Sequence, residues 1–341
     1  MLKERGVVVK VLVTGATGFL GGYLLRELRE YGYDVYAVGR NERKGSFITG
    51  NGIVFYCVDF TDRSSLEMCF AKGIDYVIHA GALSSPWGAW SDFYINNVVG
   101  TEVVCELCVD YNVKRLVFVS SPSVYTGVPE DRLNIKETEY DKNNELNYYI
   151  KSKLMAESIV RKFTSETFET VIIRPRGLFG IGDSSLVPRL LETNARKGIP
   201  LIRGGNAVID ITCVENVANA CVLALSASDV SGEIFNITNL EPMVFKDVVE
   251  LFFGAIGVKL NYLKLPYLLL YTAGIFSEKF FSKNKEPLIT RYTVYTLAFS
   301  QTLDCSKAIE KLGYTPNKTI REGISDYARW YKSKNNLIAT L

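Results

Sequence analysis

The sequence predicts an α/β fold, with a doubly wound parallel sheet and a smaller, interleaved C-terminal lobe. Apolar, β-branched runs of strand length alternate with stretches of helical character through the first half of the 341 residues. The first such run, Val7 to Val13, leads into a turn with glycine at every third position and then a helix. We expect the sheet domain to comprise residues 7–180 and 207–239, and the lobe to comprise residues 181–206 and 240–335.

The glycine turn between the first strand and the first helix is typical of a site for a nucleotide pyrophosphate. Glycine is needed there because the backbone must turn sharply and approach the phosphates closely. The helix N-terminal N–H groups and the positive end of the helix dipole are then directed at the phosphates. The predicted site comprises Gly15, Thr17, Gly18, Phe19, Leu20 and Gly21.

The spacing Gly-x-x-Gly-x-x-Gly after Val13-Thr14 resembles the extended branch of the short-chain dehydrogenase/reductase superfamily, also described as the NAD-dependent epimerase/dehydratase superfamily. Two-domain dehydrogenases carry Gly-x-Gly-x-x-Gly instead. The resemblance implies a Rossmann domain that binds NAD or NADP. It extends over essentially the whole chain, through the motifs described below.

The second strand, Asp34 to Gly39, is followed by Arg40, and this position separates the two cofactors. An acidic residue at the strand end would accept hydrogen bonds from the ribose hydroxyls of NAD, whereas a basic residue can pair with the 2′-phosphate of NADP. Arg40 therefore favours NADP. NAD stays possible, because an arginine here can also stack on the adenine or lie in solvent.

The third strand, Gly52 to Val58, precedes a helix from Ser64 to Phe70, which Asp62 is expected to cap. The fourth strand, Ile74 to His79, ends in a turn of small residues. The resemblance implies that Asp59 and Phe60 contact the adenine. It also implies that the turn lies under the cofactor ribose, with Ala80, Gly81 and Ala82 as its members.

His79 is the only histidine, and we expect it to be buried and satisfied by backbone groups, with no metal site in the chain. A helix is expected from Val98 to Val109, and the resemblance places Asn97, just before it, near the cofactor. The fifth strand, Lys114 to Ser121, is followed by a loop to Leu146 that is expected to lie over the site.

The second strong motif is a Tyr-x-x-x-Lys formed by Tyr149 and Lys153. Four residues apart on a helix, both side chains project from one face, so the ammonium is expected to lower the pKa of the phenol. Tyr149 can then act as a general acid or base. Tyr148 is the competitor, but it would place Ser152 four residues on, which gives no such activation.

The third catalytic member is a hydroxyl that holds the substrate oxygen. Ser121 matches the family pattern Ser-Ser-x-x-Val-Tyr at the end of a central strand, and Ser123 is the alternative. Further on, the segment from Arg174 to Asp183 resembles the one that follows the sixth strand in the family. Pro175 and Gly177 would then lie against the nicotinamide, while Arg174 and Asp183 are expected to serve the structure at least as much as the substrate.

Sugar-nucleotide epimerases carry an arginine for the substrate diphosphate at the position of Ile209. An apolar residue there removes a charged contact of about 2 kcal/mol or more. Segments 174–183, 186–191, 287–292 and 304–316 instead resemble the 3β-hydroxysteroid dehydrogenase and 2-alkyl-3-oxoalkanoate reductase group. That resemblance implies a lipid-like substrate.

The stretch from Leu263 to Phe276 is apolar but too short and interrupted to span a bilayer. It suits a pocket lid or an interfacial helix, with buried core or a dimer contact as the alternatives. We therefore expect at most peripheral membrane contact. The resemblance also implies a homodimer that pairs the helices around Val98 and Tyr149.

The composition favours a small-molecule partner and argues against nucleic acid. The chain has 39 basic and 37 acidic residues, a net charge of +2 and no long run of either sign. No apolar segment with a cleavage site precedes the first strand, so we expect a cytoplasmic protein. The seven cysteines are scattered and odd in number, which argues against a disulfide framework. Cys105 and Cys108 are expected to pack in the core.

Together these features predict an NAD(P)(H)-dependent oxidoreductase that interconverts a hydrophobic ketone, steroid-like or 3-oxoacyl-like, and a secondary alcohol. Ser121, Tyr149 and Lys153 are the predicted catalytic residues. One alternative is a nucleotide-sugar epimerase or dehydratase with tightly bound NAD. The other is a non-catalytic NAD(P)-binding subunit, although such proteins usually lack part of the catalytic set.

Overall fold

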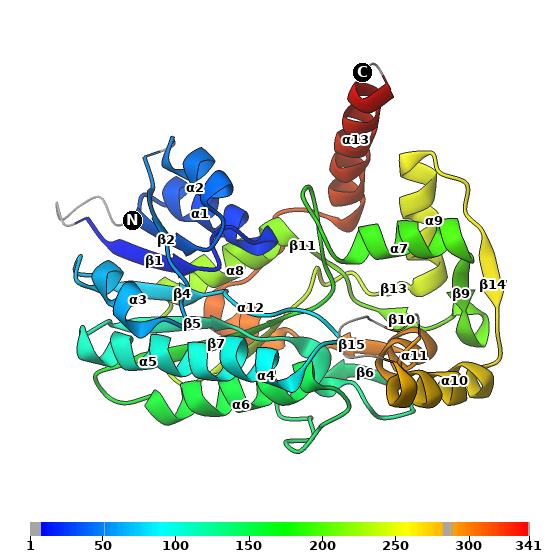
Figure 1. The fold of residues 1–341 in the computed structure, drawn as a ribbon, viewed down its shortest axis with the longest axis horizontal. Helices are drawn as coiled ribbons and strands as arrows, with labels where there is room; N and C mark the ends of the chain where they lie inside the picture. The colour runs from blue at the N-terminus through cyan, green and yellow to red at the C-terminus, as the bar shows by residue number, and fades with distance from the viewer. Residues whose placement is uncertain (1–7, 51, 282–286, 288, 340–341) are drawn as a thin grey trace.

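The computed structural model describes residues 8–50, 52–281, 287 and 289–339. Val7, with which the first predicted strand begins, and Leu288 lie outside these ranges. A seven-stranded parallel sheet runs through the molecule in the order β12-β7-β5-β4-β1-β2-β3 (Figure 1). Its strands are β1 (Lys10–Thr14), β2 (Asp34–Gly39), β3 (Val54–Cys57), β4 (Tyr76–His79), β5 (Arg115–Val119), β7 (Glu169–Pro175) and β12 (Ile234–Ile237).

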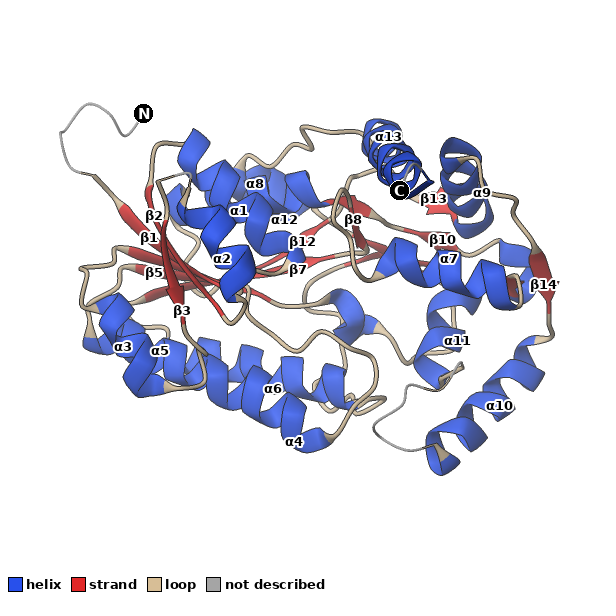
Figure 2. Cartoon of the chain, turned by 45° about the horizontal axis from the view of Figure 1, so that its top comes forward, coloured by secondary structure: helices blue, strands red, loops and turns tan. Residues whose placement is uncertain are grey.

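Helices cover both faces of this sheet, so the predicted doubly wound architecture is confirmed (Figure 2). One face carries α1 (Phe19–Glu30), α2 (Glu42–Thr49), α8 (Val214–Ser226) and α12 (Ser306–Leu312). The other carries α3 (Arg63–Phe70), α5 (Gly100–Asp110) and α6 (Tyr148–Phe163). The strand order reverses between β1 and β4, which is where such sheets bind ligands at their carboxyl ends.

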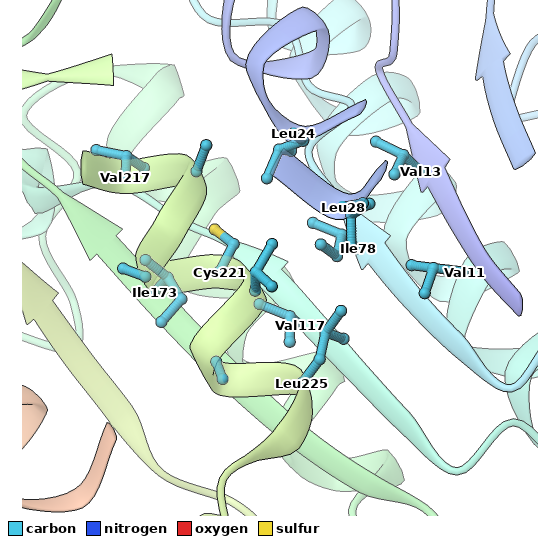
Figure 3. Packing of buried hydrophobic residues seen from close by; sticks show 14 of the residues in the cluster. Val11, Val13, Leu24, Leu28, Ile78, Val117, Ile173, Val217, Cys221 and Leu225 are labelled. Atoms are coloured by element: carbon cyan, nitrogen blue, oxygen red, sulfur yellow. The ribbon is translucent and has the colours of Figure 1, made fainter. Parts of the chain in front are cut away.

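The core under the first face is formed by apolar side chains of α1, α8 and the central strands (Figure 3). Leu24 and Leu28 of α1 pack with Cys221 and Leu225 of α8 over strand residues such as Val117. The opposite core contains Cys105 and Cys108, both fully buried and free. Their predicted packing role is confirmed.

The second lobe is built on a four-stranded sheet with the order β13-β10-β15-β6. Its strands are β6 (Arg132–Ile135), β10 (Val208–Ile209), β13 (Met243–Val244) and β15 (Gln301–Leu303). Two short pairs join β8 (Leu178–Phe179) to β11 (Thr212–Cys213) and β9 (Ile199–Leu201) to β14 (Tyr262–Lys264). Its helices are α7 (Leu186–Arg196), α9 (Phe245–Ile256), α10 (Tyr267–Phe280), α11 (Arg291–Ala298) and α13 (Ile320–Ala339).

Short helical turns complete the fold. A four-residue helix, α4 (Trp90–Phe93), runs into a π-helical segment, Tyr94–Val99, and then into α5. The helix expected from Val98 therefore begins earlier and is not regular in its first part. Turns of 3₁₀ helix occupy Pro122–Tyr125 and Ile202–Gly205.

The structure places three predicted segments differently. The expected loop after the fifth strand contains β6, which pairs with β15 from far along the chain. Residues 208–209, assigned to the sheet domain, belong to the second sheet, because β10 pairs with β13 and β15. Residues 306–312, assigned to the lobe, form α12, whose Ala308 and Leu312 pack in the main core.

The apolar stretch from Leu263 to Phe276 forms the end of β14 and most of α10. Within α10 only Leu270 and Gly274 are buried, whereas Leu268 and Phe276 are 71% and 62% exposed. The stretch is therefore a surface helix rather than buried core. Within the described residues, no helix is both long and apolar enough to cross a membrane.

Candidate active site

The turn between β1 and α1 has the geometry that a pyrophosphate requires. Gly15 has a φ of +72°, and a Cβ there would lie 2.7 Å from the backbone nitrogen of Gly81 and 2.8 Å from the carbonyl oxygen of Ala80. Gly18 caps α1 without a side-chain hydrogen bond, and the first turn of α1 holds no acidic residue. The N–H groups at this helix end thus fit the diphosphate of NAD(P). The other predicted residues lie in the turn or in α1: Thr17, Phe19, Leu20 and Gly21.

Two cations flank this turn on the side of β2. Arg40 is mostly exposed, and its Nη1 lies 3.4 Å from Asp59 Oδ2 and 3.4 Å from Asn96 Oδ1. Lys44 donates from Nζ to the carbonyl oxygen of Thr17, 3.0 Å away. Lys44 was not among the predicted cofactor residues. Its position shortly after Arg40 in the sequence could have indicated it, because a second cation there lies beside the same turn.

The ring of Phe60 packs against the small-residue turn after β4. Its ring is buried and would lie 2.7 Å from a Cβ at Gly81 and 2.4 Å from a Cβ at Gly100. The neighbouring Asp59 carboxylate accepts hydrogen bonds from the backbone and the hydroxyl of Thr61. Only glycine fits above this ring. The adenine contacts predicted for Asp59 and Phe60 stay predictions.

His79 is fully buried between two threonines. Its Nδ1 lies 2.5 Å from Thr14 Oγ1 and its Nε2 lies 3.2 Å from Thr101 Oγ1. Burial lowers the pKa of His79 to about 3, so the imidazole is neutral. The expectation of backbone partners was wrong, because side-chain hydroxyls satisfy both ring nitrogens.

Asn97 fixes the loop after β4 to the catalytic helix. Its Oδ1 accepts from the backbone of Leu83 at 2.7 Å, and its Nδ2 donates to the carbonyl oxygen of Leu83 at 3.1 Å. The same Nδ2 donates to Ser152 Oγ on α6 at 2.9 Å. Asn97 is thus a structural clamp beside the small-residue turn of Ala80, Gly81 and Ala82.

The helix that carries Tyr149 and Lys153 begins at a defined cap. The Asn147 side chain accepts from the backbone N–H of Ile150 at 2.8 Å. Lys153 is buried, and its Nζ donates to the carbonyl oxygen of Val119 at 2.9 Å. Burial lowers the pKa of Lys153 to about 8.

The structure brings Tyr149 together with Ser121, as the sequence predicts. The hydroxyls of Ser121 and Ser84 are near enough to the phenol to act to lower its pKa. Burial outweighs them, so the pKa of Tyr149 is raised above its ordinary value. The prediction of a lowered pKa was therefore wrong for the protein alone. Ser123, the alternative, lies 2.9 Å from Ser121, hydroxyl to hydroxyl.

Ser84 is a site residue that the sequence did not reveal. It stands in the loop after β4, in no motif that distinguishes it from Ser85 beside it. The residue before it, Leu83, is held by Asn97, and Ser84 lies near enough to Tyr149 to influence its pKa. The site thus contains two serine hydroxyls around one phenol.

Pro175 and Gly177 lie at the carboxyl end of β7. Pro175 is its last residue and pairs with Ile237 of β12. Gly177 has a φ of +55°, and a Cβ there would lie 3.0 Å from the carbonyl oxygen of Asp210. Both residues are thus at the edge of the sheet where the nicotinamide is expected.

Arg174 and Asp183 have structural roles. Arg174 is fully buried, and its Nη2 and Nε donate to the Glu157 carboxylate at 2.6 and 2.8 Å. Its Nη1 donates to the hydroxyl of Tyr125 at 2.7 Å. The Asp183 carboxylate accepts from three backbone N–H groups at the start of α7. Neither side chain is arranged for a substrate.

A cavity of about 490 Å³ lies at the start of α6, where Asn147 and Tyr148 line it, whereas Ser121, Tyr149 and Lys153 are not among its lining residues. Its walls include Trp87, Phe93 and Ile275, the last from α10, and the lid role of that stretch stays a prediction. Tyr292 also lines it and lies within electrostatic range of Tyr149, so the cavity and the phenol share a neighbour. Ile209 is half-buried in β10.

Comparison with known proteins found relatives that extend over most of the chain. The model of the NAD dependent epimerase/dehydratase family matches residues 11–238. An uncharacterised protein of Escherichia coli, YbjS, is 34% identical over 337 residues, which is 96% of this chain and 99% of that protein. A 2-alkyl-3-oxoalkanoate reductase of Stenotrophomonas maltophilia is 30% identical, covering 93% of this chain and 97% of that protein.

A sterol-4-alpha-carboxylate 3-dehydrogenase of Candida albicans is 31% identical, covering 94% of this chain and 97% of that protein. Among solved structures, UDP-glucose 4-epimerase of Thermotoga maritima superposes with a TM-score of 0.76 at 22% identity. That match covers 96% of this chain and all of the epimerase chain. At this identity the likeness shows the fold.

Proposed function

Because the chain belongs to the NAD-dependent epimerase/dehydratase family, the extended short-chain dehydrogenases, and is an NAD(P)-dependent oxidoreductase, we propose that it interconverts a hydrophobic ketone and a secondary alcohol. NADP(H) would be preferred over NAD(H). The observation that carries the proposal is the contact of Lys153 on α6 with the carbonyl oxygen of Val119, the last residue of β5. Ser121 follows Val119 by two residues, and Tyr149, which it influences, lies one helical turn before Lys153.

The cofactor supplies a hydride to the carbonyl carbon, or accepts it in the reverse direction. The β1–α1 turn would hold its diphosphate. Arg40, with Lys44 nearby, would pair with the 2′-phosphate, which supports the preference for NADP. The ammonium of Lys153 donates one of its three hydrogen bonds to the carbonyl oxygen of Val119. Its other N–H groups would be available to bind the nicotinamide ribose.

In the direction of reduction, Tyr149 would donate the phenolic proton to the oxygen of the substrate as the carbon receives the hydride. The C=O bond thereby becomes a CH–OH group, and the phenolate regains a proton from water. The hydroxyl of Ser121, and that of Ser84, would stabilise the developing negative charge on the oxygen.

The cavity has the volume of a small-molecule pocket, about 490 Å³. Trp87, Phe93 and Ile275 are apolar walls that would contact an apolar substrate body, although the lining also holds charged side chains, among them Glu145, Glu278 and Arg291. Ile209 gives no cation for a sugar-nucleotide diphosphate. The relatives named as a 2-alkyl-3-oxoalkanoate reductase and a sterol-4-alpha-carboxylate 3-dehydrogenase act on hydrophobic molecules, in agreement with this choice.

The test is to purify the protein, denature a sample and identify any released nucleotide, and then to titrate the protein with NADPH and NADH. We expect reversible binding that favours NADPH, followed by turnover of hydrophobic 3-oxo compounds. Stoichiometric trapped NAD with turnover of a UDP-sugar would establish the epimerase alternative. Cofactor binding without turnover of hydrophobic 3-oxo compounds or UDP-sugars would support the alternative of a non-catalytic NAD(P)-binding subunit.

A further inference from the structure

The outward side of α10 is an apolar surface that the proposed function does not explain. Six large apolar side chains in this helix or directly after it are exposed: Leu268, Leu269, Ile275, Phe276, Phe280 and Phe281. We call this set the α10 apolar face. Leu269, Phe276 and Phe280 are seven and four residues apart, so they share one side of the helix. The rings of Phe276 and Phe280 are stacked, with centroids 6.5 Å apart, although Phe280 is 75% exposed.

The inner side of α10 packs on α11, which fixes the helix with its apolar face turned outward. Figures 1 and 2 show α10 at the periphery of the second lobe, beside α11. Leu270 is buried against apolar residues of α11. A Cβ at Gly274 would lie 3.0 Å from the backbone nitrogen of Arg291, so the two helices approach closely there. The Glu278 carboxylate accepts from the backbone N–H and the Nε of Arg291 at 2.6 and 2.7 Å.

The outward side of α10 carries a cation and no carboxylate. Glu278 and Lys279 are the charged residues of this helix, and Glu278 is turned inward to Arg291. Lys279 is exposed, and its Nζ lies 5.9 Å from the centroid of the Phe280 ring. Lys264, at the end of β14, is exposed shortly before the helix begins. Positive charge therefore flanks the α10 apolar face at both ends.

One flank of α10 borders the cavity. Ile275, Lys279 and Phe281 are among the lining residues. Ile275 and Phe281 are also 41% and 45% exposed, so they lie at the rim of the cavity. Whatever covers the α10 apolar face therefore adjoins this rim.

A lipid surface fits these observations better than a second copy of the chain. A two-fold contact places the same face on both partners. It would bring together two Lys279 ammonium groups, with no carboxylate on the outward side of α10 to pair with them, and unpaired buried charge is costly. At a lipid surface the phosphates of the headgroups pair with the ammonium, while the apolar side chains enter the acyl region.

We propose that α10 is an interfacial helix that binds the protein to an anionic lipid surface, with Lys264 and Lys279 at the phosphates. The helix has 14 residues, fewer than the roughly 20 that span a bilayer, so it lies in the plane of the surface. The rim of the cavity then adjoins the lipid, from which an apolar ligand would enter. The inference goes beyond the proposed function and does not depend on the reaction.

The experiment is flotation of the full chain with vesicles of phosphatidylcholine alone and with vesicles that also contain phosphatidylglycerol. We expect tighter binding to the anionic vesicles. Phe276→Ser combined with Phe280→Ser should lower the affinity for them by about 30-fold or more, because two apolar side chains no longer enter the lipid. Lys279→Gln should lower it by about fivefold and leave binding to phosphatidylcholine alone unchanged.

The matched control is Phe47→Ser combined with Met68→Ser. It removes two exposed apolar side chains from α2 and α3 of the main sheet domain, where they are 80% and 54% exposed. We expect this variant to bind vesicles like the wild type. All the replaced side chains are exposed, and circular dichroism of each variant checks that its fold is intact.

Vesicle binding that is lost in the α10 double variant and kept in the control supports the proposal. Absent binding of the wild type to both kinds of vesicle, or equal binding of the two double variants, overturns it. Sedimentation velocity without lipid tests the second copy of the chain: a dimer that the α10 double variant dissociates would assign the face to self-association and overturn the lipid role. Since no measurement uses a substrate, failure here is distinguishable from failure of the proposed function.

Discussion

Lys153 donates a hydrogen bond from its ammonium to the backbone carbonyl oxygen of Val119, 2.9 Å away. The ammonium is not among the groups that shift the pKa of Tyr149, which burial raises. In the protein alone, Lys153 is therefore held by the neighbouring strand rather than acting as the activator of the phenol.

The first prediction concerns pH. Lys153 has a folded pKa of about 8, below the ordinary value near 10.4, because burial disfavours its charge. Between these values the unfolded chain binds more protons, so the contribution of Lys153 to the free energy of unfolding rises with pH from about 8 to about 10.4. Below pH 8 Lys153 is charged in both the folded and the unfolded protein, so burial of the ammonium lowers the free energy of unfolding by its full amount. Urea unfolding of wild type and Lys153→Met should therefore differ more at pH 7 than at pH 9.5.

The same titration should govern cofactor affinity. A neutral Lys153 binds the ribose less well, so the dissociation constant for NADPH should increase as pH rises through about 8. Lys153→Met should bind NADPH weakly and show no such increase. His79 does not interfere, because burial holds its pKa at about 3. A pH-independent wild-type dissociation constant between pH 7 and 9 would contradict the assignment.

The second prediction is that Tyr149→Phe abolishes turnover, lowering kcat by about 10³-fold or more, while NADPH affinity changes little. The phenyl ring keeps the packing of Tyr149 and loses only the hydroxyl, which lies near Ser121 and Ser84. Tyr148→Phe is the matched control on the same helix, and it should keep most of the activity. Full activity of Tyr149→Phe would remove Tyr149 from the mechanism.

The third prediction concerns the ion pair of Arg174 with Glu157, both fully buried. Arg174→Met should lower the free energy of unfolding by about 3–5 kcal/mol, because it leaves a buried carboxylate without its counter-ion. The double variant Arg174→Met with Glu157→Gln should recover part of the loss. Chemical denaturation of both variants measures this, and equal stability of the single variant and wild type would contradict it.

The sequence predicted best those features that depend on neighbours along the chain. The turn at Gly15 and the position of Tyr149 and Lys153 one turn apart on one helix follow from local spacing, and both are in the structure as expected. Asp62 also caps its helix as predicted, accepting from Ser64 and Ser65. Such features need only the geometry of one turn or one helix.

The features that could not be predicted from the sequence depend on contacts between residues distant in the chain. The nearness of Ser84 to Tyr149 requires the folded loop after β4. The pairing of β6 with β15 joins a segment that precedes β7 in the chain to one that follows β12. The raised pKa of Tyr149 depends on how completely the fold excludes water from it. The spacing to Lys153 carries no information on that.

The fourth prediction uses two glycines with similar backbone strain. Gly15→Ala should cost about 1–2 kcal/mol for its positive φ and more for the contact of the new Cβ with Gly81. It should also weaken NADPH binding by about 10-fold or more, since the turn must shift. Gly32 has a φ of +86°, and a Cβ there would have no atom within 4 Å. Gly32→Ala should therefore cost only about 1–2 kcal/mol for the positive φ and should bind NADPH normally. Thermal unfolding and NADPH titration distinguish the two, and equal NADPH affinity of both variants would count against the turn as the phosphate site.

The fifth prediction tests the choice of cofactor. Arg40 is the mostly exposed cation at the end of β2, beside Asp59. Arg40→Asp should weaken NADPH binding by about 10–100-fold, because it replaces a partner of the 2′-phosphate with a like charge, whereas NADH should bind as well or better. Arg43→Asp places the same negative charge on α2 and is the control for a general electrostatic effect. If Arg40→Asp changes NADPH and NADH binding equally, Arg40 stacks on the adenine or lies in solvent, and the preference for NADP falls. If only NADPH binding is lost, a single side chain at this strand end accounts for the discrimination between the two cofactors.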